Sequence, residues 1–201
     1  SLGLGYTATK FIAECKGDTA KAYTIHKVVS HITLITSGII AVLVAIFAKH
    51  LSSWLNAPEL GGLLRLASIA IIFNAINTSQ IGELSGFKAY KDIARNNTWA
   101  GIITFIGSVV LTYYYDIIGA VTALIISFAT NCLFNRISIN KFIRHPKAHN
   151  NNKLYREILS FTIPVALQES SYAITHWVST VLIIKMAGYG ELGIYSAATQ
   201  W

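Results

Sequence analysis

Long stretches without a charged side chain are the feature that most restricts how this chain can fold. From Val28 to Ala48 there are 21 consecutive residues without a formal charge. A helix of that length, rising about 1.5 Å per residue, spans the roughly 30 Å hydrocarbon core of a bilayer. Only 12% of the residues are charged, whereas a soluble domain typically carries about 25%. The sequence therefore predicts an all-α fold, a polytopic membrane helix bundle.

The remaining apolar segments divide the chain into further helices. Asp116 is the only charge between two of these segments, so we expect them to form a tight helical hairpin. Because the first residues have the character of a helix interior and the last of a helix beginning, we expect the natural protein to be longer at both ends. The predicted segments are Ser1 to Cys15, Leu64 to Phe87, Thr98 to Tyr115, Ile117 to Phe134 and Ile158 to Ile184.

The basic residues are distributed unevenly among the polar connections. Numbering the connections alternately assigns 13 of the 16 Lys and Arg residues to one side, and only Lys49, Arg65 and Lys185 to the other. The richer side is expected to be cytoplasmic by the positive-inside rule. It comprises Lys10 and the segments Lys16 to Lys27, Lys88 to Asn97 and Asn135 to Arg156. The net charge of +7 is thus explained without a nucleic-acid partner, while the last segment is either a solvated linker or a contact with anionic membrane lipids.

Four polar residues recur every three positions along the predicted helix from Leu64 to Phe87. They are Asn74, Asn77, Gln80 and Glu83. Each step turns about 60° around the helix axis, so neighbouring members share a face. Polar groups in hydrocarbon need partners on another helix or a wet cavity. Both roles, hydrogen bonding between helices and lining a substrate cavity, remain open at this point.

The segment from Ile158 to Ile184 carries one formal charge, Glu169, and one histidine, His176. Seven residues turn a helix by 20° less than two full turns, so both side chains project the same way, about 10 Å apart along the axis. An ionised carboxylate facing lipid is costly, and intramembrane carboxylates are candidate functional groups. We expect Glu169 to face a cavity and to exchange protons or contact substrate; the alternative is a neutral, hydrogen-bonded side chain.

Two basic residues belong to the same set of candidate cavity residues. Lys10 lies near the end of the first helix, and Arg65 follows the Gly61-Gly62 pair. Each either extends its charge to the membrane interface or binds an anionic substrate group. Together with Lys185 they are the helix-associated cations of the chain.

No motif for soluble enzyme chemistry is present. The sequence contains no G-x-x-x-x-G-K-[ST], H-E-x-x-H or G-x-S-x-G pattern. We therefore predict no catalytic residue, no metal and no cofactor, and expect any active transport to draw on an ion gradient or on product consumption. Cys15 and Cys132 lack a CxxC or histidine partner, and we expect buried, unreactive thiols.

Three segments carry a family resemblance. They are GLGYTATKFIAE (Gly3 to Glu14), the run from Leu63 through Asn135, and the Ile163-Pro164 pair followed by an apolar helix with Trp177 and then GYGELGIYSAATQW (Gly188 to Trp201). In this order they resemble a bacterial polysaccharide or O-antigen flippase of the multidrug/oligosaccharidyl-lipid/polysaccharide exporter superfamily. The resemblance covers most of the chain, and no single motif in it is catalytic.

The resemblance implies two helical bundles around a cavity that opens alternately to either side of the inner membrane. Residues 1–135 would be the remainder of the N-terminal bundle, 136–156 a cytoplasmic linker and 157–201 the start of the C-terminal bundle. The implied substrate is an oligosaccharide on undecaprenyl pyrophosphate, and candidate partner proteins are a polysaccharide polymerase and a chain-length regulator. The alternatives are a cation-coupled drug or metabolite antiporter of the same superfamily and a membrane-embedded polysaccharide-assembly enzyme.

Overall fold

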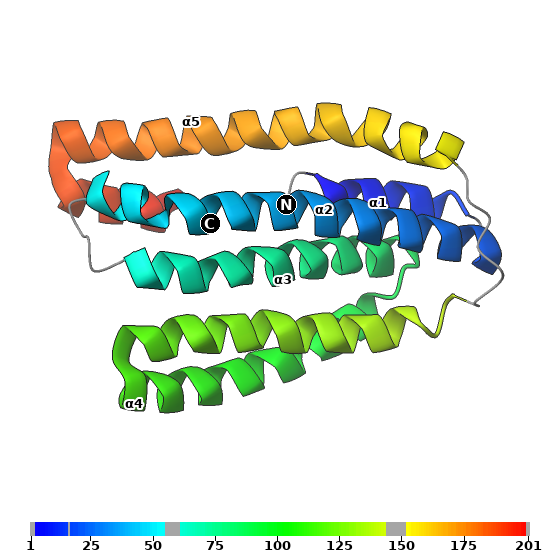
Figure 1. Cartoon of the computed structure of the whole chain (residues 1–201), viewed down its shortest axis with the longest axis horizontal. Coiled ribbons are helices and arrows are strands. Elements are labelled where there is room, and N and C mark those ends of the chain that lie inside the picture. The colour runs from blue at the N-terminus through cyan, green and yellow to red at the C-terminus, as the bar shows by residue number, and fades with distance from the viewer. Residues whose placement is uncertain (1–2, 16, 55–60, 144–151, 200–201) are drawn as a thin grey trace.

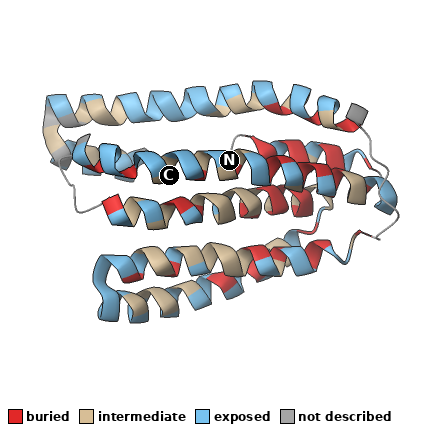
Figure 2. Cartoon of the chain, in the orientation of Figure 1, coloured by how far each residue is buried: buried red, intermediate tan, exposed pale blue. Residues whose placement is uncertain are grey.

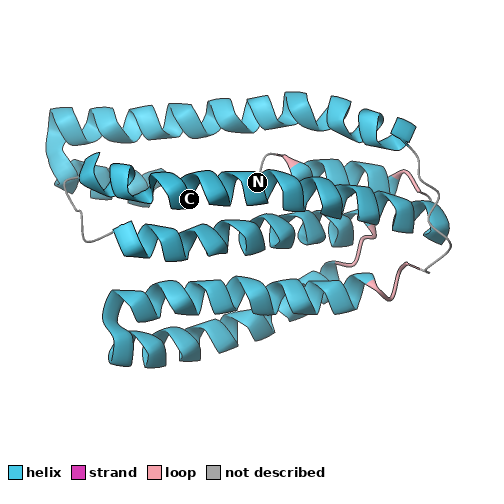
Figure 3. Ribbon diagram, viewed as in Figure 1, coloured by secondary structure: helices cyan, strands magenta, loops and turns pink. Residues whose placement is uncertain are grey.

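The structure is a computed structural model that describes residues 3–15, 17–54, 61–143 and 152–199, and every regular element in these ranges is an α-helix (Figure 3). The predicted all-α fold is confirmed. Three helices, α2, α3 and α4, are long and apolar enough to cross a membrane. The helices are α1 (Leu4–Ala13), α2 (Thr19–Trp54), α3 (Gly61–Gly86), α4 (Tyr90–Ile139) and α5 (Asn152–Thr199).

The predicted hairpin is present inside α4. Asp116 has φ 48° and ψ −132°, which interrupts the helix and folds it into two antiparallel arms (Figure 1). A second interruption lies in α5 at Gly188, with φ 85° and ψ 178°. The spanning of α5 from Ile158 to Ile184 stays a prediction, because α5 is not among the three helices that are apolar enough by composition.

The helices extend further than the uncharged runs predict. α2 begins at Thr19 and α4 at Tyr90. The segments Lys16 to Lys27 and Lys88 to Asn97, which were predicted to be polar connections, are therefore mostly helical. Backbone hydrogen bonding inside a helix does not stop where hydrocarbon ends. At the start of α2 the Asp18 carboxylate accepts hydrogen bonds from the N–H groups of Ala20 and Lys21, which satisfies the free donors of the first turn. Residues 144–151 of the third predicted connection lie outside the described residues.

The helices lie side by side along one axis, with α3 in contact with α1, α2 and α4 (Figure 1). The approach of α1 to α3 is close enough that a Cβ at Gly82 would overlap the backbone of Gly5. The Thr9 hydroxyl donates to the Gly82 carbonyl at 2.9 Å. Glycine on both helices thus permits backbone contact, as is common in membrane bundles. α5 contacts only α1 and α2 in the described part of the chain.

Burial is concentrated at one end of the bundle (Figure 2). We call it the connection end, because residues 14–15, 17–18, 87–89 and 140–143 lie there; the opposite end, with Asp116, is the hairpin end. The core packs apolar side chains from all five helices or their immediate extensions. Its largest members include Phe11, Ile25, Leu84, Ile139 and Ile158. Most large apolar side chains toward the hairpin end are exposed, as expected for helices that meet lipid or further protein.

Candidate functional site

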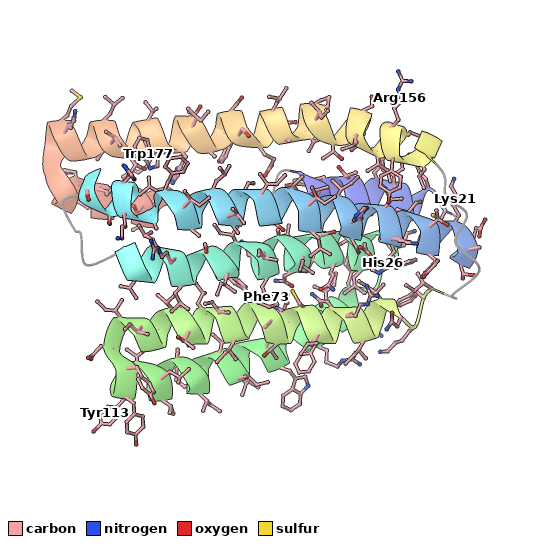
Figure 4. The ribbon with its side chains drawn as sticks, in the orientation of Figure 1. Lys21, His26, Phe73, Tyr113, Arg156 and Trp177 are labelled. Carbon is pink, nitrogen blue, oxygen red and sulfur yellow. The ribbon has the colours of Figure 1, made fainter. Side chains whose placement is uncertain are left out.

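Three ionisable side chains from three helices meet at the connection end. Glu83 of α3 has no exposed surface, and His26 of α2 is 3% exposed. His26 Nδ1 lies 2.5 Å from Glu83 Oε2, and an Arg136 guanidinium nitrogen lies 2.5 Å from His26 Nε2. The imidazole, labelled in Figure 4, therefore connects a carboxylate on one helix to a guanidinium on another.

These contacts assign a hydrogen-bonding role to each ring nitrogen of His26. Arginine only donates hydrogen bonds, so Nε2 must accept with its lone pair. Nδ1 then carries the ring proton and donates it to the carboxylate. The imidazole thus lies between the Glu83 carboxyl group and the Arg136 guanidinium. A second proton on the ring would occupy Nε2 and remove the acceptor that Arg136 uses.

The helix ends place the three side chains together. His26 lies two turns into α2, while Glu83 and Arg136 each lie three residues before the end of their helix. Antiparallel neighbours bring such positions to the same level of the bundle. Arg136 is an exposed residue at the edge of the group, so its charge reaches solvent or headgroups while Glu83 stays enclosed.

A network of amides surrounds this group on the α3 and α4 side. Asn135 donates to Asn77 Oδ1 at 2.9 Å and accepts from Asn96 at 3.0 Å. Asn96 also donates to the Ser138 hydroxyl at 3.0 Å. All four side chains are buried, and each hydrogen bond joins different helices or the two arms of α4. The network holds α3 and both arms in one register.

Three buried oxygen atoms on one face of α3 have no hydrogen-bond partner: Ser79 Oγ, Gln80 Oε1 and Glu83 Oε1. Ser79 and Gln80 line a cavity of about 110 Å³. The cavity is bounded by α2 on one side and by Arg136 on another. Its other lining residues are Ser30, Thr33, Leu34 and Ile76. Buried polar groups without partners are costly, so this cavity is the part of the cluster that is prepared for a polar occupant.

The four polar residues predicted to recur along α3 divide between the two possible roles, hydrogen bonding between helices and lining a cavity. Asn77 bonds to another helix, Gln80 lines the cavity described above, and Glu83 belongs to the ionisable group. Asn74 is exposed and lines a separate cavity of about 80 Å³ with Thr36. Asn77, Gln80 and Glu83 thus belong to the buried polar groups at this end of α3, whereas Asn74, about one turn before Asn77, lines the separate cavity.

The other predicted cavity residues lie elsewhere. Lys10 of α1 is exposed, with Nζ 3.9 Å from the centre of the Phe161 ring on α5, a cation–π contact. Arg65 is exposed near the start of α3, at the hairpin end. Glu169 is half-buried and His176 exposed, both on α5, which does not contact α3 or α4 in the described ranges. Their roles in binding stay predictions.

The sequence reasoning missed His26, Arg136 and the amides of α4. His26 and Asn96 fall in segments predicted to be polar connections, and Arg136 was counted as a topology charge. The hairpin offered a usable signal: Asn96 lies 20 residues before Asp116 and Asn135 lies 19 residues after it. Residues equidistant from a hairpin turn face each other across antiparallel arms. The same rule finds Thr104 and Ser127, whose hydroxyls are 2.5 Å apart.

Both cysteines are buried and unpaired, as predicted. Cys15 lies between α1 and α2, where its thiol donates to the Phe11 carbonyl at 3.3 Å. Burial raises the pKa of the Cys15 thiol above its usual value, which lowers the thiolate fraction and hence its reactivity. Among the described residues no group of three or more His, Cys, Asp or Glu side chains is arranged to hold a metal ion.

The comparison with protein families gives one match, to a family described as polysaccharide biosynthesis protein, over residues 16–201. No curated protein and no solved structure matches the chain. The matched range includes α2 through α5, and therefore both the Glu83–His26–Arg136 group and the network of amides. Its extent, together with the helical membrane architecture, shows that the chain belongs to this polysaccharide biosynthesis family, in agreement with the resemblance to polysaccharide flippases.

Proposed function

We propose that this chain belongs to a flippase that moves an undecaprenyl-pyrophosphate-linked oligosaccharide across the bacterial inner membrane by alternating access. Family membership and the apolar helices support a membrane role in polysaccharide biosynthesis. The observation that carries the proposal is the buried Glu83–His26–Arg136 group. It connects α2, α3 and α4 through contacts that one proton would rearrange. Ionisable groups inside membrane bundles characteristically serve transport.

Transport is favoured over covalent chemistry by the connections at the hairpin end. The two arms of α4 are joined through Asp116 alone, and six residues, 55–60, connect α2 to α3. A membrane-embedded polymerase or glycosyltransferase would need a larger extracytoplasmic loop to carry its catalytic groups. We accordingly propose a transporter whose partners are the lipid-linked oligosaccharide, membrane lipids and the polymerase that uses the translocated product.

The orientation follows from charge. The three segments rich in Lys and Arg begin and end at the connection end of the bundle (Figure 1). Arg65 and Lys49 lie toward the other end, on α3 and α2. Applying the positive-inside rule, we propose that the connection end faces the cytoplasm. The buried ionisable group then lies near the side from which the substrate enters.

The test is Glu83→Gln in the full-length protein, in cells that lack the natural gene. Gln keeps the shape of Glu but cannot ionise. We expect normal abundance, loss of surface polysaccharide and accumulation of the lipid-linked oligosaccharide on the cytoplasmic side. Asp92→Asn is the matched control, because Asp92 is an acid at the same end that pairs with Arg95 and Lys141 on the surface.

Two results would contradict the proposal. Full export by the Glu83→Gln variant would remove the buried group from the transport cycle. Purified protein in vesicles that alters the covalent structure of a supplied lipid-linked oligosaccharide, without moving it between leaflets, would identify an enzyme instead.

A further inference from the structure

The cavity between α2, α3 and the second arm of α4 carries an inference that goes beyond transport itself. We propose that it binds the phosphoryl headgroup of a membrane lipid, with Arg136 as the principal ligand. Arg136 forms one wall of the cavity.

The cavity is lined by polar groups that are buried and available. Ser79 is 2% exposed and Gln80 is 6% exposed, and Ser79 Oγ and Gln80 Oε1 have no partner in the described structure. Ser30 and Thr33 of α2 also line the cavity, and the Thr33 hydroxyl already donates to the Val29 carbonyl at 2.8 Å. A hydroxyl can donate to a phosphoryl oxygen, and a half-turn of the Gln80 amide presents its NH₂ group in the same direction. The volume of about 110 Å³ suits a single phosphoryl group.

The guanidinium of Arg136 has N–H donors that its contact with His26 does not use. Its contact with His26 Nε2 occupies one guanidinium N–H, whereas guanidinium carries five. The planar fork of the remaining donors matches the oxygen atoms of a phosphoryl group, for which arginine is the preferred ligand. Because Arg136 is itself exposed, a headgroup can reach it without crossing the core.

The depth of the cavity fits a lipid rather than a soluble anion. Ser79 lies seven residues before the end of α3, about 10 Å below the connection end, which is the level at which headgroups give way to hydrocarbon. Leu34 and Ile76 form the apolar part of the lining. Beyond Leu34, α2 exposes Ile35, Ile39, Val42 and Leu43, a surface along which a lipid tail can lie.

Occupation of the site would act on the buried group. A phosphoryl group bound by the remaining donors of Arg136 would shift the guanidinium relative to His26 Nε2, so lipid binding would alter that contact. A proton on Nε2 would have the same effect, since it removes the acceptor. Lipid binding and the state of the Glu83–His26 pair are therefore linked through one side chain. The class of lipid rests on the proposed function: either the polyprenyl carrier of the oligosaccharide or a bulk phospholipid supplies the same phosphoryl chemistry.

The experiment measures lipid binding to the purified full-length protein in detergent, by native mass spectrometry and by thermal stabilisation. Farnesyl pyrophosphate represents the carrier, dioleoylphosphatidylglycerol the bulk lipid, and farnesol and dioleoylglycerol their uncharged counterparts. We expect at least one phosphoryl lipid to bind about tenfold or more tighter than its counterpart, as is reasonable for charge-assisted hydrogen bonds. Arg136→Gln should abolish that difference and Arg136→Lys should restore part of it.

Two further variants separate binding from folding. Ser30→Leu fills the cavity from its α2 wall without touching the His26 contacts, so it should weaken phosphoryl-lipid binding while the protein stays folded. Arg156→Gln is the matched control, because Arg156 projects away from the bundle at the start of α5 (Figure 4). It should bind like the unaltered protein.

The outcomes distinguish this site from the proposed function. Preference for farnesyl pyrophosphate identifies the carrier, and equal binding of phosphatidylglycerol identifies a general headgroup site; both support the inference. Phosphoryl-lipid binding that is unchanged in Arg136→Gln and in Ser30→Leu, or absent altogether, would overturn it. Oligosaccharide transport without Arg136-dependent lipid binding would leave the proposed function intact and eliminate the site. Arg136-dependent lipid binding without oligosaccharide transport would support the site and contradict the proposed function.

Discussion

The two carboxylates predicted to lie within the membrane occupy very different surroundings. Glu83 is fully enclosed by three helices, with His26 as its hydrogen-bond partner. Glu169 is half-buried on α5, and no hydrogen bond of its side chain to another residue is present in the described part of the chain. The burial pattern extends this contrast to whole regions: the connection end is packed, and the far part of α5 is largely exposed (Figure 2).

The difference in burial predicts that substitution of Glu83 affects mainly folding stability, whereas substitution of Glu169 affects mainly binding at the face of α5. An enclosed carboxylate must have its charge compensated by its neighbours, so its removal disturbs folding. A carboxylate on an exposed face has weaker ties to the fold, and its substitution affects mainly what approaches that face. Alanine substitution of Glu83 should thus destabilise the fold far more than substitution of Glu169, whereas Glu83→Gln and Glu169→Gln should both lose export.

The largest effect is expected for Glu83→Ala. The change leaves His26 and Arg136 without their acidic partner and opens a cavity in the core, a combination that typically costs about 3–5 kcal/mol. Thermal unfolding in detergent measures it. Asp92→Ala, at the exposed start of α4, should lower the unfolding temperature far less. If the unfolding temperature fell equally in the two variants, burial of Glu83 would not explain its contribution to stability.

An intermediate effect is expected for Asn135→Ala. It removes the central amide of the network, which leaves Asn77 Oδ1 without its donor and Asn96 with Ser138 alone, at a cost of about 1–3 kcal/mol. A double-mutant cycle with Asn96→Ala should show a positive coupling energy, because the two side chains bond directly. Additive losses would contradict that reading. Asn131→Ala, whose amide bonds to Asn97 on an exposed face, serves as the control.

The smallest effect on stability is expected for Glu169→Gln, within about 0.5 kcal/mol of the unaltered protein. Export is the informative measurement here, since we expect the variant to accumulate normally and to lose surface polysaccharide. Wild-type export would show that Glu169 need not ionise. Marked destabilisation would instead place Glu169 in a structural role like that of Glu83.

The sequence predicted the helices and the hairpin because hydrophobic length and a single charge between two apolar runs are local signals. It also predicted that Asn77, Gln80 and Glu83 share one face. It did not predict their partners, because contacts between His26 and Glu83 depend on how far each helix extends past the hydrocarbon. Charge is ambiguous in this respect: Arg136 counts as a topology signal in the sequence and as a hydrogen-bond donor to the core in three dimensions.

The attachment of α5 has a mechanical consequence. Among the described residues, side-chain contacts fasten its first turns to α1 and α2, by Tyr155 to His31, by Phe161 to Phe11 and by Thr162 to Thr7. Beyond Thr162 the helix continues for 25 residues to Ala187, a length of about 38 Å. The Thr7–Thr162 contact is therefore a point about which the rest of α5 can tilt. A tilt of about 5° at the threonine pair would move the Ala187 end of this segment through about 3 Å, so a small repacking at Thr7 and Thr162 would be magnified along the length of the helix.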